Sequence, residues 1–424
     1  MGLLKLKAGA LQLTLFIAVV IALLLAGFIL LVHTHKRFSL QSDFIIQTAQ
    51  NTTRGIRQAL INQMPLNDTI SIDLEEDYKT LKVQREFWGV FEKVTSIATI
   101  KKHTLKRVAL IGGAQSKNNR TALYVQDNNK PLVLVGNTKI EGVVYLPERG
   151  VKSGNISGEY YYGSQLIYGV IRKASILPSL HKQTISQLSF IEKQMNKIKT
   201  SNFITLENGK TFSNSFLNKK QMAFSNSAIK LSNINLVGNI IIQSKIKITV
   251  ASSSSLKDVI LIAPEIEIED DVKGAFQVIA SKNISVGKKV YLEYPSALVL
   301  NEEEIQQSHN AAESVKQNKV FIDERSTIKG VVLYISESKA NNYNSQIEIK
   351  EKTTIIGEVY CSKNLELNGA VYGSVFTNNF IANQFGSIYQ NHIYNGKIIV
   401  DSLPQEYVGL SFNNSKKGVL KWLY

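Results

Sequence analysis

The sequence has few of the residues on which disulfide-stapled modules and metal sites depend. Its 424 residues include one cysteine, Cys361, so no intramolecular disulfide can form. We interpret Cys361 as a buried apolar residue rather than a nucleophile. None of the six histidines is paired with another at the i, i+4 spacing that places two metal ligands on one side of a helix. The single cysteine therefore argues against a small disulfide-stapled secreted module, and the histidine spacing argues against a helical histidine metal site.

Catalytic motifs are also missing. The sequence has no Gly-rich phosphate loop ending in Lys-Ser or Lys-Thr and no Gly-x-Ser-x-Gly elbow. We therefore predict that the protein is not an enzyme and uses no cofactor. The formal net charge is +15, but lysines are scattered among acidic residues and no basic block alternates with aromatics. Nucleic acid is therefore not an expected partner.

A long apolar run is the strongest positive signal. Residues Ala8 to Val32 carry no charge and are apolar except for Gln12 and Thr14. At about 1.5 Å per residue the run is roughly 37 Å long, enough to cross a hydrocarbon core of about 30 Å. We predict a retained membrane helix over residues 8–32 rather than a cleaved signal peptide, whose apolar core would be shorter.

Positive charge flanks this run nearly equally on both sides. Lys5 and Lys7 precede it, and Lys36 and Arg37 follow it, so charge alone does not decide the orientation. The leader, residues 1–7, has little room for a domain. We therefore expect a cytoplasmic N-terminus and a body outside the cytoplasm, in the periplasm of a bacterium with the helix in the inner membrane.

An amphipathic helical stalk is predicted over residues 33–64. Apolar or small side chains recur there at spacings of three, four and seven, which gives one stripe on an otherwise polar helix. Pro65 is a credible stop because proline cannot continue the hydrogen-bond ladder. We predict that the stripe contacts partner proteins. Its residues are Phe38, Ile45, Ala49, Thr52, Ile56 and Leu60.

A hydrophobic N-terminal helix that continues into an amphipathic half, with a globular part at its end, resembles the type IV pilins and pseudopilins. In those families the hydrophobic helices bundle inside a filament. The resemblance covers only the N-terminal helical segment. Pilins carry an acidic residue early in the apolar run, whereas this sequence has none between Met1 and Asp43. A simple signal anchor with a stalk is the alternative.

The remainder of the chain is predicted to be mainly β, because runs of β-branched and aromatic residues alternate with polar or glycine-bearing segments. One helix is expected, opened by Pro178 and continued by apolar residues at helical spacing. The aromatic C-terminus, Trp422-Leu423-Tyr424, is expected to dock onto the body. The predicted parts are a first β-rich region, 69–147; an insertion, 148–200, with a helix at 178–198; a β-solenoid region, 201–400, with a polar excursion at 301–318; and a tail, 401–424.

A repeated scheme is the second strong signal. Four segments share an aliphatic residue, any residue, a glycine, and a short apolar strand that closes on tyrosine. In a stacked coil the alternate aliphatic side chains point inward, and glycine permits the close turn at each corner. The corner glycines predicted in this way are Gly142, Gly330, Gly357 and Gly369.

Short alternating strands between Asn239 and Leu300 follow the same logic. The pattern predicts a parallel β-helix, or solenoid, and it is similar in texture to the polymer-forming domain of bactofilins. This resemblance spans about Leu236 to Ala382, with Leu132 to Tyr145 as a further candidate segment, and implies a structural role. A twisted antiparallel β-sandwich is the alternative fold.

Two groups of residues are candidates for binding. Glu265, Glu267 and Glu269 would project from one strand face, followed by Asp270 and Asp271, so calcium could bind where their oxygens converge. The alternative is an ordinary solvated strand face. Three tyrosines, residues 160–162, lie between glycines and are interpreted as packing residues, with a sugar platform as the alternative.

We therefore predict a single-pass, membrane-anchored structural protein of the cell envelope. It would be a scaffold, or a subunit of a pilus-like or secretion-type complex, with lipid as partner through residues 8–32 and other envelope proteins, including further copies, as partners elsewhere. The alternative is a membrane-tethered β-helix protein that binds or cleaves polysaccharide.

Overall fold

The structure is a computed structural model in which the chain is mainly β, with one long N-terminal helix and one further helix, as predicted. It describes residues 8–116, 119–194, 204–302, 318–336, 343–413 and 415–423. The chain forms two compact units. The first comprises residues 8–57, 69–83 and 96–106, and the second comprises 58–68, 84–95 and 107–423.

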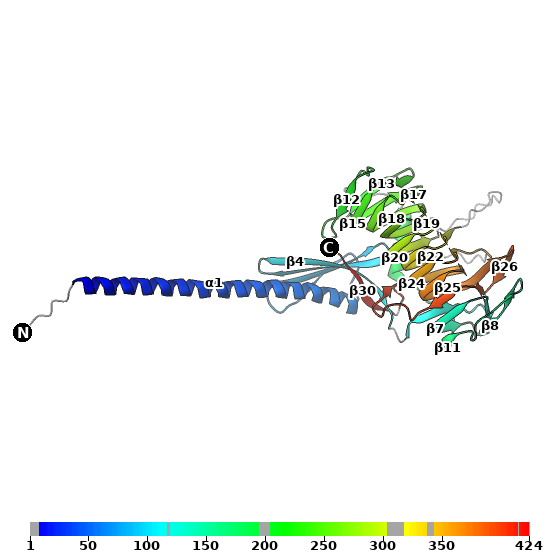
Figure 1. The fold of residues 1–424 in the computed structure, drawn as a ribbon, viewed down its shortest axis with the longest axis horizontal. Helices are drawn as coiled ribbons and strands as arrows, with labels where there is room; N and C mark the ends of the chain where they lie inside the picture. The colour runs from blue at the N-terminus through cyan, green and yellow to red at the C-terminus, as the bar shows by residue number, and fades with distance from the viewer. Residues whose placement is uncertain are drawn as a thin grey trace, which may run out of the picture. The chain divides into compact units, whose positions relative to one another are not determined.

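Helix α1, Ala8–Ile61, is continuous (Figure 1). The predicted membrane helix and stalk are therefore one rod, which ends four residues before Pro65, close to the predicted stop. The helix is long and apolar enough to cross a membrane. Its side chains from Gly9 to Leu40 are exposed, whereas burial begins beyond that point.

The later part of α1 packs against strands of the first unit. Thr52 and Ile56 are almost fully buried, and Gly55 lies at the closest approach. A Cβ on Gly55 would overlap the hydroxyl of Ser96 and would lie 2.9 Å from a methyl of Val83. The small residue therefore lets the helix backbone come close to the sheet.

The four strands that follow α1 in the sequence form a sheet in which each lies beside the next one along the chain, and two C-terminal strands complete this sheet. Its order is β1-β2-β3-β4-β29, and β30 also pairs with β4. The C-terminal strand β30 runs antiparallel to β4, with Leu423 opposite Val108 and buried. The prediction that the C-terminus docks onto the body is confirmed for Leu423. Trp422 pairs with Ala109 but is 38% exposed, and Tyr424 lies outside the described residues. The bounds are β1, Thr69–Ile72; β2, Lys79–Trp88; β3, Phe91–Ile100; β4, His103–Ala114; β29, Val408–Gly409; and β30, Lys416–Leu423.

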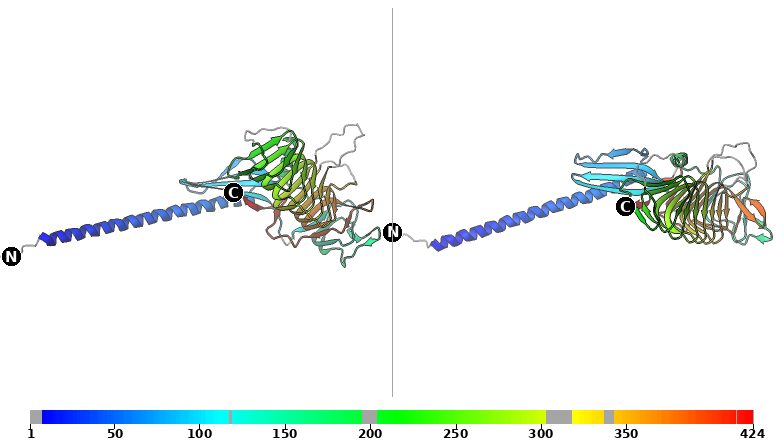
Figure 2. Two further views of the ribbon diagram at one scale, coloured as in Figure 1. Left: turned by 45° about the horizontal axis from the view of Figure 1, so that its top comes forward. Right: turned by 90° about the horizontal axis from the view of Figure 1, so that it is seen from above.

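A second, closed and barrel-like sheet makes up most of the second unit (Figure 2). Apart from β26, which pairs antiparallel with β25, its strands pair in parallel with the strands that follow one repeat later, as in the series β18, β19, β20, β22, β24 and β25. The parallel pairing excludes the antiparallel sandwich for this sheet. The strands are β5, Thr121–Val125; β7, Lys139–Leu146; β11, Tyr168–Lys173; β12, Thr211–Asn214; β13, Gln221–Ser225; β14, Ile229–Leu231; β15, Asn235–Gly238; β16, Ile240–Ser244; β17, Lys247–Val250; β18, Ser255–Ile268; β19, Lys273–Val286; β20, Tyr291–Asn301; β21, Lys319–Ile322; β22, Thr327–Ile335; β23, Ile347–Ile349; β24, Thr354–Leu367; β25, Ala370–Gln384; β26, Ser387–Gln390; and β28, Lys397–Ile399.

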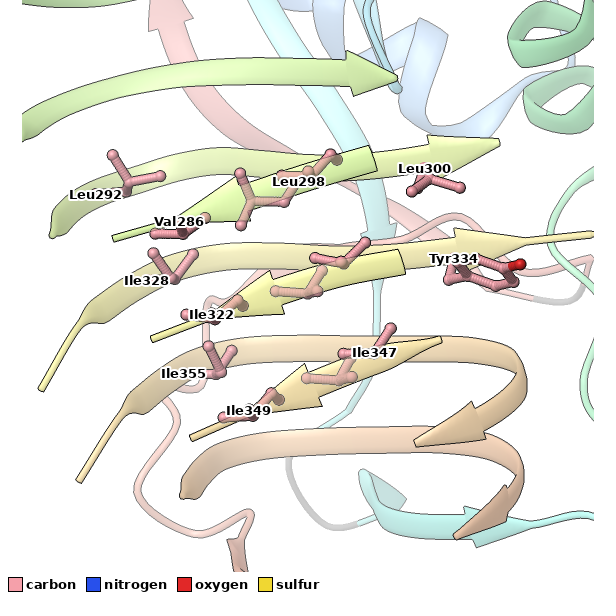
Figure 3. Close-up of a cluster of buried hydrophobic side chains, with 14 of the residues drawn as sticks. Val286, Leu292, Leu298, Leu300, Ile322, Ile328, Tyr334, Ile347, Ile349 and Ile355 are labelled. Atoms are coloured by element: carbon pink, nitrogen blue, oxygen red, sulfur yellow. The ribbon is translucent and has the colours of Figure 1, made fainter. Parts of the chain in front are cut away.

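Columns of aliphatic side chains fill the interior of the closed sheet (Figure 3). Ile328 pairs with Ile355, and Ile355 pairs with Val371, so each side chain stacks on its equivalent in the next strand. All three are fully buried. The alternation predicted from the sequence therefore directs one side of each strand into a continuous core.

The predicted boundaries at 147 and 200 do not match this sheet. Strands β5 and β7, from the predicted first region, and β11, from the predicted insertion, join its far end: β25 pairs with β5, β5 with β7, and β7 with β11. The pairing of β25 with β5 joins residues about 250 positions apart, such as Leu123 and Val375, which local patterns cannot reveal. Smaller sheets lie nearby, formed by β6, Leu132–Val135; β8, Val151–Ser153; β27, His392–Tyr394; β9, Asn155–Ile156; and β10, Glu159–Tyr160.

Helix α2, Lys182–Gln194, lies within the helix predicted at 178–198. It begins four residues after Pro178, and residues 195–198 lie outside the described residues. The predicted polar excursion at 301–318 is likewise described only at its two ends, because residues 303–317 lie outside the described residues.

A second hydrophobic core covers one outer face of the closed sheet. Aromatic and aliphatic residues of β22, β24 and β25, such as Leu333 and Tyr360, meet side chains from α2, β4 and β30. Trp88 packs edge-on against Phe216, with ring centroids 5.2 Å apart. The β2–β3 turn therefore packs on this face of the second unit, together with the C-terminal tail.

The four predicted corner glycines are not equivalent. Gly330 and Gly357 lie inside strands, pair with each other, and have φ of +139° and +147°. A Cβ on Gly357 would overlap the carbonyl oxygen of Gly330. The next residue in this column is Gly373, with φ of +151°, rather than the predicted Gly369.

Gly369 instead lies in the connection between β24 and β25. The prediction that Gly369 is equivalent to the other three glycines was wrong. The register between β24 and β25 is set by the column of buried aliphatic side chains and not by the spacing of the sequence motif. Gly142 has φ of +125° and pairs with Gly169 in the same manner.

Candidate interaction surfaces

The first candidate surface is the exposed apolar part of α1. Every large apolar side chain from Leu11 to Val32 that the structure describes is at least one-third exposed, and Phe28 is 65% exposed. An apolar surface of this length is stable in water only when lipid or another chain covers it. The helix therefore supports the prediction of a membrane-type N-terminal segment.

The predicted interaction stripe on residues 33–64 is divided by the fold. Phe38 and Ile45 are 69% and 54% exposed, and Ala49 and Leu60 are half-buried. Ile56 is only 1% exposed, so it belongs to the protein's own core and the prediction that it contacts a partner is wrong. Thr52, from the same stripe, is also fully buried. This part of the stripe faces the strands because Gly55 beside it allows the closest approach.

A buried ion cluster that was not predicted from sequence patterns lies where the chain leaves α1. The Arg85 guanidinium donates to both carboxylate oxygens of Glu92 at 2.6 and 2.7 Å, and the Lys417 ammonium lies 2.8 Å from the same carboxylate. Arg85 also donates to the carbonyl of Met64 and to the side chain of Gln183, at 2.6 and 2.7 Å.

The cluster joins four segments of the second unit: the chain after α1, the β2–β3 pair, α2 and β30. Burial by itself would raise the pKa of Glu92, but the hydrogen bonds and charges of Arg85 and Lys417 more than offset it, so this pKa lies below its usual value. The sequence contains a signal for the Arg85–Glu92 pair of this cluster, because these opposite charges flank the turn at Gly89. Nothing local points to Lys417.

A second buried carboxylate, Glu358 of β24, holds the C-terminal tail against the closed sheet. It is 3% exposed and accepts the backbone N–H of Leu410 at 2.6 Å and the amide of Gln115 at 3.3 Å. Burial raises the pKa of Glu358 to about 7, although these hydrogen bonds and the charge of Arg120 act in the opposite direction. Tyr407 secures the same tail by donating to the carbonyl of Gly330 at 3.0 Å.

Four of the five predicted calcium ligands line an open acidic groove, and Glu265 does not. Glu267, Glu269, Asp270 and Asp271 border the groove, together with Asp323. Within the described residues, no group of three His, Cys, Asp or Glu side chains is arranged to hold a metal ion.

Lysines engage these carboxylates instead. The ammonium of Lys247 lies 2.5 Å from Glu267, and that of Lys230 lies 3.0 Å from Glu269. A carboxylate of Asp270 accepts the backbone N–H of Lys288 at 2.7 Å. The arrangement is that of a solvated strand face, which was the alternative interpretation of Glu265, Glu267 and Glu269.

The lone cysteine is placed as expected. Cys361 is fully buried in the interior of the closed sheet, and burial raises the pKa of its thiol to about 12. A thiol in this state is a poor nucleophile because little thiolate forms.

Comparisons with known proteins give little beyond these observations. No protein-family model and no curated protein matches the sequence. Among solved structures, the chain is similar to the competence-associated pilin ComZ from Thermus thermophilus, with 9% identity over 89% of this chain and 96% of that chain, and a TM-score of 0.21. At this TM-score the two proteins do not share a demonstrated fold, so the functional conclusion depends on the residues of this chain.

Proposed function

We propose that the protein is a single-pass structural component of the cell envelope that assembles with other proteins through its N-terminal helix, and that it is not an enzyme. The observation that carries this proposal is α1, a single helix with an apolar, unpacked first part and a later part packed on strands. Such a helix anchors a folded body to lipid and leaves one side of the rod free for neighbours.

Within this class, a pilus-like or secretion-type subunit fits best. Phe38 and Ile45 lie beyond the predicted membrane segment yet remain exposed, so lipid alone does not cover them. Helices packed side by side would bury them, as the pilin-like arrangement of the segment implies. The missing acidic residue near the N-terminus sets this helix apart from the pilin pattern.

Polar substitution of the free side of α1 tests the assembly. We expect the double variant Phe38→Ser, Ile45→Ser to abolish the high-mass complex that is seen by native electrophoresis of solubilised membranes, because it removes the apolar contact surface. The matched control is Ile61→Ser, at the end of α1, where the side chain is 79% exposed. An unchanged complex in the double variant, with normal membrane insertion, would contradict the proposal.

The proposed location of the body outside the cytoplasm has a direct test, because the native thiol of Cys361 is buried. A cysteine introduced at the exposed position Ser253 should be labelled by a membrane-impermeant maleimide in spheroplasts. The unmodified chain supplies the background. Labelling that requires lysis of the cells would place the body in the cytoplasm instead.

We also propose that the closed parallel sheet is a β-helix solenoid, comparable to bactofilins, that acts as a rigid scaffold. The support is the repeated parallel register, in which Val286, Ile322 and Ile349 occupy one buried column. A solenoid of this kind presents long outer faces at fixed spacing without any catalytic pocket.

A further inference from the structure

Two tyrosines stand out on the surface near the end of the closed sheet. Tyr160, at the end of β10, is 64% exposed, and Tyr162 is 62% exposed. Between them, Tyr161 turns inward, packs against the core of the closed sheet, and donates a hydrogen bond to the carbonyl of Gln165. Because side chains alternate along extended backbone, Tyr160 and Tyr162 project on the same, outer side.

The backbone that carries these tyrosines is fixed on both sides. The N–H of Gly136 donates to the carbonyl of Tyr160, and the N–H of Tyr162 donates to the carbonyl of Gly136, both at 3.0 Å. Upstream, a tight turn at Ser157 and Gly158, with φ of +51° and +92°, closes the β9–β10 hairpin. The backbone that carries the two exposed rings is therefore fixed before any ligand arrives, which reduces the backbone part of the ordering cost of binding.

Polar groups surround this tyrosine pair. Tyr394 of β27 is half-buried beside it, and burial together with the nearby carboxylates of Glu159 and Glu351 raises the pKa of its phenol. The side-chain oxygen of Asn395 accepts the backbone N–H of Asn137 at 2.8 Å. The surface therefore combines flat aromatic faces with carboxylate and amide groups that can bind hydroxyls.

We propose that this surface, defined by Tyr160, Tyr162 and Tyr394, binds an uncharged polysaccharide chain. Aromatic faces stack on the C–H faces of pyranose rings, and the carboxylates accept hydrogen bonds from sugar hydroxyls. The negative charge of Glu159 and Glu351 repels phosphate and uronate groups, so nucleic acids and acidic polysaccharides fit poorly. The protein would thus hold the neutral glycan of an envelope layer in addition to its assembly role.

The test is a calorimetric titration of the purified full chain with cellohexaose and chitohexaose, and with an oligogalacturonate of equal length as the acidic counterpart. A polyoxyethylene detergent is used because a maltoside headgroup would compete. We expect a neutral hexasaccharide to bind. The double variant Tyr160→Ala, Tyr162→Ala should weaken that binding roughly tenfold, because each lost ring removes a stacking contact.

Tyr343→Ala is the matched control, since Tyr343 is 57% exposed and lies in another part of the closed-sheet unit. It should leave binding unchanged. The proposal is overturned if neither neutral hexasaccharide binds, if the acidic oligomer binds more tightly, or if the double variant binds as well as the unmodified chain. Retained circular dichroism of the double variant, whose two side chains are exposed, separates loss of the site from loss of the fold.

Discussion

The interior of the closed sheet and its covered outer face are built by different rules. Inside, columns of Ile, Val and Leu repeat from strand to strand almost without polar groups. The covered outer face mixes aromatic packing with buried titratable side chains such as Arg85, Glu92 and Glu358. In the repeating core, the local alternation of apolar residues is enough to specify the packing, because each strand packs on an equivalent strand. An interface between distant segments needs specific polar contacts to select one arrangement.

The largest expected effect comes from breaking the buried ion cluster. Arg85→Ala removes the bidentate partner of Glu92, and we expect the free energy of unfolding to fall by about 3–5 kcal/mol. Denaturant titration of the full chain, followed by fluorescence of the buried Trp88, measures the change. Lys173→Ala is the control, because its ion pair with Glu148 is exposed and should be worth less than about 1 kcal/mol. Equal losses in the two variants would contradict the importance of the cluster.

An intermediate effect is expected in the interior columns. Ile355→Ala should destabilise the protein by about 2–4 kcal/mol, because it leaves a cavity between Ile328 and Val371. The neighbouring Ile356→Ala should change stability by less than about 1 kcal/mol, since that side chain points out of the column and is half-buried. The same denaturant titration compares them, and a reversed order would show that the register is shifted by one residue.

The smallest effect concerns Glu358 and depends on pH. Its pKa is raised to about 7, so the folded state holds the proton more tightly than the unfolded state does. The stabilising contribution of the protonated carboxyl is complete below the unfolded pKa and is lost as pH rises from about 4.5 to about 7. Glu358→Gln removes this dependence, and we expect it to be more stable than the unmodified chain by roughly 1 kcal/mol at pH 8 and not at pH 4.

Stability is expected to depend on pH in the opposite direction at Glu348. Although burial opposes it, hydrogen bonds and charges from Lys350 and Lys319 lower the pKa of Glu348. Its stabilisation is therefore present above the unfolded pKa and is lost as pH falls through the folded pKa. Glu348→Gln should reduce the melting temperature at pH 7 but have little effect at acidic pH. Parallel pH profiles for the two variants would contradict both assignments.

Much of the fold could be predicted because its signals are local. Each signal depends only on residues close together in the sequence. The signals are the charge-free run in residues 8–32, the helical spacing up to Leu60 and the alternation of Ile266 and Ile268. The fold places Ile266 and Ile268 in the core, at 1% exposure each. The prediction failed where the outcome depended on packing partners, as for Ile56 and Gly369.

The candidate surfaces could be predicted only in part. Phe38 and Ile45 were found from the stripe alone, and the three tyrosines were noticed, but their division into an inward Tyr161 and two outward rings required the backbone pairing with Gly136. The Glu358 and Lys417 contacts could not be found, because their partners lie 52 and 325 positions away.

The amino-acid sequence by itself determined that the chain has an apolar helical rod followed by a β-rich body with a repeating buried face, because periodicity and uninterrupted apolarity act over a few neighbouring residues. Tertiary structure alone decided which strands close the sheet, which side of the rod packs against strands, and which charges are buried. Those choices depend on free energies shared between segments hundreds of residues apart, and no local pattern records them.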